Sequence, residues 1–527
     1  MKTLLKLVPL LLLLFACERG EPVRKGREKA RLSEIGHEML VLGEQMKDPY
    51  SVENITLAVK SIYPDKASRM DIKPTDIYVR FLPSDDTQYL ALEALGLNLL
   101  DHPLDRKIIR EGDYYHDPDL PSDCITWQYA VVPNGFVFPA GIQYEILDEC
   151  YIADNDVATR ASGIDWDEVE REAYRLTGNE SMLKSLTRAD GEGFIPEGRI
   201  SIVDDDFDLG EPVGVSGVMV CVNSFVKFAT AYTDEEGYYE MKKAFSTDVR
   251  YRLVFKNRKG FSLGVNLLLV PASISTLGQH SAEGLDVIVD KEAEGKLFSR
   301  CVVNNACYDY YARCKTEGAS AVATPPENLR IWLFQNVRGS VAPMLQQGVL
   351  IDSGLVKEYL GEYADLLKMF LPDMAIGLKE KADYASIYSE TIHMLAHASH
   401  FMRAGRDYWE KYMLYLLRTF VANMGFNYGS GLEAYAGYCE VSEMWSYFLQ
   451  NIICKERYGI GIPTEGLTHW FSPQILLYLE ERGLSESKIF SVLGPDVTSL
   501  EKFKSALTNV YPEHLSLITQ AFERYEK

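Results

Sequence analysis

Three of the nine histidines in the chain lie close together, at His393, His397 and His400. The run from Tyr384 to Ala404 contains no glycine or proline, and Gly405 follows it, so this segment is predicted to be a helix. At about 100° per residue, the three imidazoles fall on one stripe about 60° wide. Imidazole nitrogen is a common zinc ligand, so the spacing points to metal chemistry.

His393 and His397 are one helical turn apart, and we expect them to share one Zn²⁺ ion. His400 lies about 10 Å along the helix axis from His393. Metal–nitrogen bonds are only about 2 Å long, so a regular helix does not bring all three to one ion. We therefore place His400 behind the ligands or in the wall of a cleft.

The segment HMLAH, residues 393–397, resembles the His-Glu-x-x-His helix of zincin metallopeptidases, with Met394 at the glutamate position. In zincins that glutamate takes a proton from metal-bound water and is not a ligand. A general base typically raises the rate of such a reaction by about 10²–10⁴-fold. Because Met394 is not a base, the resemblance implies impaired peptide hydrolysis, and we assign no catalytic residue. Glu390, one turn before His393, is the nearest alternative base, although zincin geometry does not favour it in that role. We otherwise place its side chain behind the ligands.

The third metal ligand must come from elsewhere in the chain. A metzincin would place glycine at position 400 and histidine at 403, where this chain has His400 and Arg403, so that class is excluded. A gluzincin-type metallopeptidase uses a glutamate from a later helix, and Glu440 and Glu443 share one helix face. Glu443 stands in an apolar stretch, where a carboxylate is costly without a partner. We predict Glu443 as the ligand, with Glu440 as the alternative.

These side chains belong to a C-terminal domain, residues 293–527, which is predicted to be mainly helical and zincin-like. Its long proline-free stretches predict helices, and two short β-rich runs predict strands. The expected helices are 352–370, 384–403, 407–424 and 433–457, and the expected strands are 328–334 and 374–378.

A central domain, residues 207–292, is predicted to be a β-sandwich because short β-rich runs follow one another closely. The segments PVGVSGVMVCVN, ATAYTDEEGYYEM and YRLVFKN resemble the carboxypeptidase-regulatory or transthyretin-like module. This resemblance implies a non-catalytic spacer or binding unit. The expected strands are 213–222, 226–233, 238–242, 251–255 and 267–270.

The N-terminal domain, residues 41–155, is predicted to be mixed α/β, with helices at 51–63 and 90–100. Its expected strands or extended segments are 76–83, 125–133 and 136–147. A linker, residues 156–206, follows with one helix at 166–176. The acidic run 204–206 lacks the ligand spacing of an EF-hand loop, so we expect a solvated linker there instead of a calcium site.

The chain begins with lysines and an apolar run at 7–16, too short to span a membrane but typical of a secretory signal. Leu-Phe-Ala before Cys17 resembles a bacterial lipobox, which implies a signal segment at 1–17, cut before Cys17, and lipid on that cysteine. Residues 18–40 would form a tether. The formal charge of −22 argues against nucleic-acid binding.

The segments IYVRFLP, HPLD, GDYYHDPDLP, TWQYAVVP and YEILDECYI are similar to a family of uncharacterised Bacteroidetes lipoproteins, in which many members carry an intact His-Glu-x-x-His stretch. The resemblance implies a multidomain α+β protein lipid-anchored in the cell envelope, at the outer membrane of a Gram-negative bacterium. We expect a degenerate zincin-like domain that binds a peptide, protein or glycan. The alternatives are an active zinc metallopeptidase with a non-standard base and a structural surface protein without metal.

Overall fold

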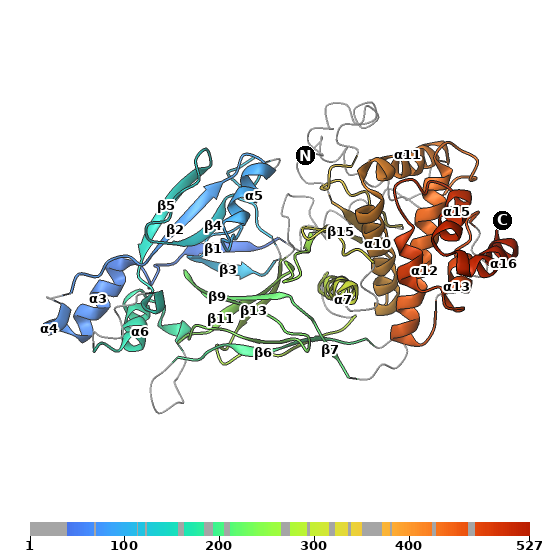
Figure 1. The fold of residues 1–527 in the computed structure, drawn as a ribbon. Coiled ribbons are helices and arrows are strands. Elements are labelled where there is room, and N and C mark those ends of the chain that lie inside the picture. The colour runs from blue at the N-terminus through green and yellow to red at the C-terminus, as the bar shows by residue number, and fades with distance from the viewer. Residues whose placement is uncertain are drawn as a thin grey trace, which may run out of the picture.

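The computed structural model shows a mixed α+β chain, with a β-rich N-terminal part and a largely helical C-terminal part (Figure 1). Within the described residues, no helix is both long and apolar enough to span a membrane. Cys17 and the expected tether up to residue 38 lie outside the described part. The structure describes residues 39–67, 70–112, 114–121, 124–155, 163–183, 193–204, 211–264, 274–291, 296–315, 322–335, 339–349, 372–379, 382–423, 428–461 and 469–526.

The N-terminal part is built on a three-stranded sheet of order β4-β2-β5, whose strands all pair antiparallel. The expected α/β domain is therefore of the α+β kind. A separate antiparallel pair, β1 and β3, lies beside it. The elements are β1 (Val41–Gln45), α3 (Val52–Ile62), α4 (Pro64–Ala67), β2 (Asp76–Leu82), α5 (Asp86–Ala94), β3 (Arg106–Arg110), β4 (Gln128–Pro133), β5 (Gln143–Cys150) and α6 (Trp166–Leu176).

The helix expected at 90–100 is wrong at its C-terminal end. Helix α5 stops at Ala94, and Gly96 follows with a φ of 72°. Glycine accepts this left-handed conformation at little cost, and the turn ends the helix. Leu100 then forms an isolated bridge with Tyr129.

The central part contains two sheets that share one core, which includes Ile200, Val222 and Leu253. One sheet has the order β13-β11-β8-β9, and the other has the order β10-β6-β14 with β7 paired to β6. The strands are β6 (Glu197–Ile202), β7 (Val213–Gly214), β8 (Met219–Ser224), β9 (Lys227–Tyr232), β10 (Tyr238–Glu240), β11 (Val249–Val254), β13 (Ile274–His280) and β14 (Val287–Val289).

The expected linker is wrong at its end, because β6 is a central strand of the second sheet. Ile200 and Ile202 are fully buried in the core between the sheets. They stand two positions apart, so their side chains lie on the same face of the strand. The strand expected at 267–270 lies outside the described residues.

Asp204, just after β6, is not a solvated linker residue. Its side chain is 1% exposed and forms an ion pair with Arg457, at 2.8 Å between Oδ2 and Nη2. The Tyr458 hydroxyl also donates to the Asp204 carboxylate. The residue that follows β6 is therefore tied to the last turn of the helix that carries Arg457 by an ion pair whose carboxylate is buried. The other two aspartates of the acidic run lie outside the described residues.

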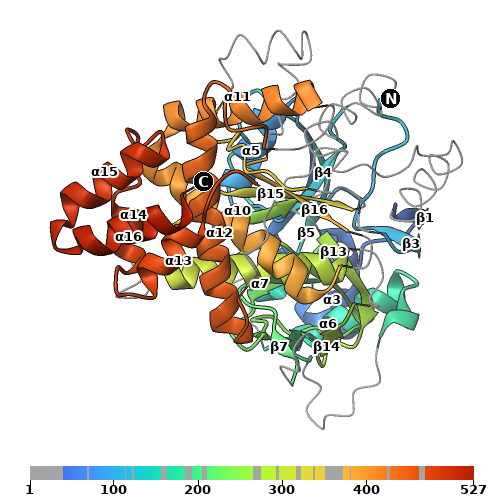
Figure 2. The same cartoon turned by 90° about the vertical axis from the view of Figure 1, so that its right-hand side faces the viewer.

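The C-terminal part is arranged around α10, which packs against α12 and α7; Figure 2 shows these helices from the side. Helix α10 has the expected bounds, with Asp383 as its N-cap and Gly405 after its last turn. The segment expected at 352–370 lies outside the described residues. The elements are α7 (Leu297–Cys314), β15 (Arg330–Gln335), β16 (Met374–Leu378), α10 (Tyr384–Ala404), α11 (Arg406–Asn423), α12 (Ala436–Tyr458), α13 (Gln474–Glu480), α14 (Glu486–Ser491), α15 (Leu500–Val510) and α16 (Leu515–Tyr525).

The expected boundary between the second and third domains is crossed by a parallel sheet. Its order is β12-β15-β16, with β12 (Ser262–Gly264) contributed by the central part. Helix α7 also joins the two parts, since Cys301, Val302 and Tyr310 belong to the same core as the central sheets.

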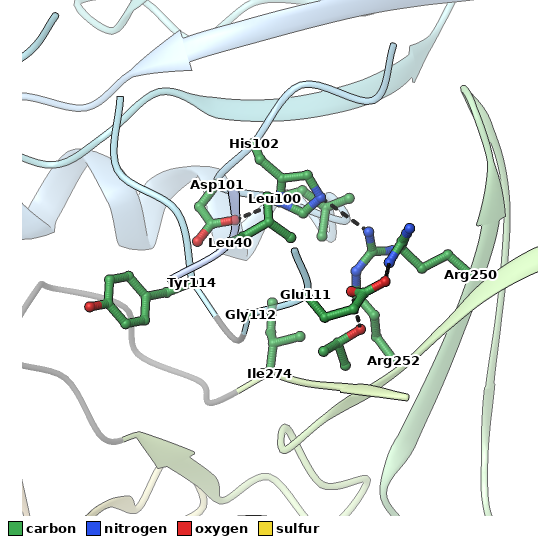
Figure 3. A pocket seen from close by; sticks show the side chains of 11 residues that line it. Leu40, Leu100, Asp101, His102, Glu111, Gly112, Tyr114, Arg250, Arg252 and Ile274 are labelled. Carbon is green, nitrogen blue, oxygen red and sulfur yellow. Dashed lines mark hydrogen bonds and ion pairs between the residues drawn. The ribbon is translucent and has the colours of Figure 1, made fainter. Parts of the chain in front are cut away.

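A polar cluster joins the N-terminal part to the central sheet (Figure 3). The His102 imidazole, buried between them, contacts Asp101 at 2.7 Å and Arg252 at 3.1 Å. Burial lowers the pKa of His102, so the neutral ring accepts from the guanidinium. Beside it, Glu111 pairs with Arg250 and accepts from Thr276. These charges satisfy one another, so the cluster is a joint between two parts of the fold.

Replacing Asp204 with asparagine is expected to lower the free energy of unfolding by about 3 kcal/mol, because Arg457 keeps its charge but loses its buried partner. Urea denaturation measures the change. Asp71→Asn removes an exposed ion pair with Lys73 and should cost less than about 0.5 kcal/mol. Equal effects of the two substitutions would contradict a buried clamp.

Candidate metal centre

Helices α10 and α12 run antiparallel and meet through buried polar side chains. Ser389 and Gln450 meet near one end of the contact, and His400 and Ser442 meet near the other. Between these pairs, Glu443 lies opposite two imidazoles. Polar groups inside a helix interface are costly unless they are paired or bind something.

The structure brings His393, His397 and Glu443 together in one buried group that could hold a metal ion. The Nε2 atoms of the two imidazoles are 3.2 Å apart. The glutamate oxygens lie 3.3 Å from Nε2 of His393 and 3.5 Å from Nε2 of His397. In a tetrahedral zinc site with bonds of about 2.0–2.1 Å, neighbouring donors are about 3.3 Å apart. The two imidazole nitrogens, and each imidazole with the carboxylate oxygen that faces it, therefore have the spacing of neighbouring zinc ligands.

The electrostatics of this group favour a cation at its centre. His393 is 4% exposed, and His397 and Glu443 are each 1% exposed. Burial alone would raise the pKa of Glu443, but the two histidines hold it well below its usual range. Burial lowers the pKa of His397, whereas Glu443 outweighs burial and raises the pKa of His393. An ionised carboxylate is thus enclosed, and a protonated His393 or a bound cation must balance its charge.

A tyrosine from the third helix completes the surroundings of the carboxylate. The Tyr412 hydroxyl, on α11, donates to Oε1 of Glu443. Its ring also stacks on His397, with centroids 5.6 Å apart. Sequence reasoning missed this residue, because nothing in the spacing of α11 marks one of its aromatic residues as polar.

The other expected residues lie outside this group. His400 is fully buried, so it does not form the wall of an open cleft; its Nδ1 lies 3.2 Å from the Ser442 hydroxyl. Glu440 meets the backbone N–H of Leu500 instead of the imidazoles, and burial raises its pKa to about 7. A carboxyl that keeps its proton near neutral pH is a poor metal ligand. The geometry therefore selects Glu443.

Two further positions decide what the centre can do chemically. Met394 is 4% exposed and packs in the apolar core, where it offers no proton acceptor. Glu390 is partly buried, close enough to influence His393 and His397 electrostatically. Three protein ligands leave one tetrahedral position open, as in catalytic zinc sites, whereas structural sites are closed by four.

Comparisons of the chain with protein-family models, with curated proteins and with solved structures find no match.

Replacing Glu443 with glutamine is expected to weaken zinc binding by more than about 100-fold, because the anionic ligand is lost. Glu440→Gln makes the same change one turn earlier on α12 and should alter the affinity by less than about threefold. Competition titration with a chromophoric chelator measures both. A larger effect at Glu440 would show that the wrong carboxylate has been chosen.

Glu440 is also expected to make stability depend on pH. Its pKa is raised from 4.5 to about 7 in the folded chain. The folded state holds the proton more tightly than the unfolded state does. The contribution of this proton to the free energy of unfolding is therefore complete below about pH 4.5 and is lost as the pH rises through 7.

Between pH 5 and pH 8, the free energy of unfolding of the unaltered protein should fall relative to that of Glu440→Gln, by at most about 3 kcal/mol. Urea denaturation of metal-free protein at the two pH values measures the difference. Glu513→Gln, at an exposed position, should keep the pH dependence of the unaltered protein. Parallel pH curves for the unaltered protein and Glu440→Gln would exclude a raised pKa.

Proposed function

We propose that the C-terminal part is a zinc-binding domain of the zincin type that has lost its hydrolytic base. The observation that carries this proposal is the buried convergence of His393, His397 and Glu443 from two antiparallel helices. Two histidines one turn apart, with a glutamate from a later helix, form the ligand set of a gluzincin-type centre. Zinc, when bound, would supply a Lewis acid with one open coordination position.

The residue beside the first ligand argues against ordinary peptide hydrolysis. Met394 occupies the position at which the zincin helix carries its proton acceptor, and a thioether does not take a proton from water. The protein would then use its open metal position to bind a donor group of a peptide, protein or glycan, without cleaving it efficiently.

The remaining parts of the chain fit a binding role at the cell envelope. The lipobox-like sequence before Cys17 supports anchoring to a membrane through lipid. Two sheets with a common core separate the N-terminal part from the helices, as in a transthyretin-like spacer. We propose that the anchor holds the metal domain at the outer membrane of a Gram-negative bacterium, where the ligand would meet it.

An active metallopeptidase with Glu390 as its base is the second candidate. Glu390 is partly buried and acts electrostatically on both histidine ligands and on Tyr447. Within the described part of the chain its carboxylate has no hydrogen bond or ion pair that would occupy it. A carboxylate left free beside a metal centre is a reasonable proton acceptor.

Restoring the base tests which candidate holds. Met394→Glu is expected to raise zinc-dependent hydrolysis of a fluorogenic peptide mixture by about 10²-fold or more. Met394→Gln has nearly the same shape without a base and should leave hydrolysis at background.

Strong hydrolysis by the unaltered protein, abolished by His393→Ala and by Glu390→Gln, would favour the second candidate instead. Absence of zinc, both in protein purified without chelator and after zinc addition, would remove both metal functions. Metal analysis by mass spectrometry makes that measurement.

A further inference from the structure

Gln450 lies on α12 seven residues after Glu443, so the two side chains occupy the same face of the helix. It is 6% exposed and reaches across to α10. Its Nε2 donates to the backbone carbonyl of Ser389 at 3.0 Å and also contacts the Ser389 hydroxyl at 2.8 Å. A carbonyl oxygen accepts only, so the amide nitrogen must face Ser389.

The orientation of this amide determines the protonation of His393. With Nε2 facing Ser389, Oε1 faces Nδ1 of His393 at 3.2 Å. An amide oxygen is an acceptor only, so Nδ1 must carry a hydrogen. In the neutral imidazole Nε2 then carries a lone pair, and this is the atom directed at Glu443 and His397.

His397 has no comparable support in the described part of the chain, where its buried Nδ1 has no hydrogen-bond partner. The two ligands therefore differ, although they lie on one helix. His393 is oriented before any ion arrives, whereas His397 must be oriented by the ion itself and by Tyr412 stacking.

We propose that Gln450 is a positioning residue that fixes the Nδ1–H tautomer of His393 through Ser389 and so presents its Nε2 lone pair to the metal. This inference rests on the proposed zinc centre and deepens it. Outer groups that hold a ligating histidine typically change metal affinity by about 10–100-fold when they are removed.

Zinc affinity is the first readout. Gln450→Leu keeps an apolar side chain of similar size but cannot accept from His393, and we expect a 10–100-fold loss of affinity. Ser442→Ala is the matched control, because it removes a contact from the same helix to His400, which is not a ligand. It should change affinity by less than about threefold. Gln450→Glu retains an acceptor and should bind more tightly than Gln450→Leu.

The tautomer itself is the second readout, and a merely structural role for Gln450 would not alter it. Long-range ¹⁵N–¹H spectra of metal-free, ¹⁵N-histidine-labelled protein should show His393 in the Nδ1–H form when they are recorded at a pH above the raised pKa of His393, where the ring is neutral. In Gln450→Leu the spectra should show a mixture of both forms.

The outcomes separate this inference from the function on which it rests. Failure of the unaltered protein to bind zinc would overturn the proposed centre. Zinc binding by the unaltered protein with equal affinity in Gln450→Leu would overturn the role of Gln450 alone. An Nε2–H form of His393 in the unaltered, metal-free protein would also overturn it.

Discussion

The buried carboxylate of Glu443 is the constraint on which the helical part depends. A carboxylate that is 1% exposed costs several kcal/mol unless its charge is balanced. Balance requires α12 to lie antiparallel to α10 in the one register that places Glu443 opposite His393 and His397. A shift of one helical turn, about 5.4 Å, would separate the charge from both imidazoles. Because Tyr412 donates to the same carboxylate, the position of α11 is tied to that register too.

The helices that meet at this charge are also joined to the rest of the molecule. Helix α10 packs on α7, which shares its core with the central sheets. Arg457 in the last turn of α12 is held by Asp204, which follows β6. The two helices that supply the candidate ligands are therefore each fixed to the central part by separate contacts. Packing in the interior is too dense to let one helix move alone, so the geometry of the centre depends on the two central sheets as well as on the helices.

Local signals were sufficient to predict the helix nearest the centre and the residues that the structure brings together there. Helix α10 was predictable because an uninterrupted run begins after Asp383 and stops before Gly405. Glu443 was predictable because it is a carboxylate in an otherwise apolar stretch. Helix α7 was missed because it is buried on nearly every side and has no polar face to give a period. Asp204 was placed wrongly because its partner is more than 250 residues away, and adjacent acidic residues usually indicate solvent.

The parallel pairing of β12 with β15 has a consequence for how the chain folds. Ser262 pairs with Arg330, so the sheet beneath α10 can form only after a long stretch of chain has emerged and returned. Parallel contacts between distant residues are slow to form, because the entropy of closing the loop is lost before the contact stabilises anything. Helix α10 would thus meet its sheet late, and the order of folding would run from the central sheets outward to the candidate ligands.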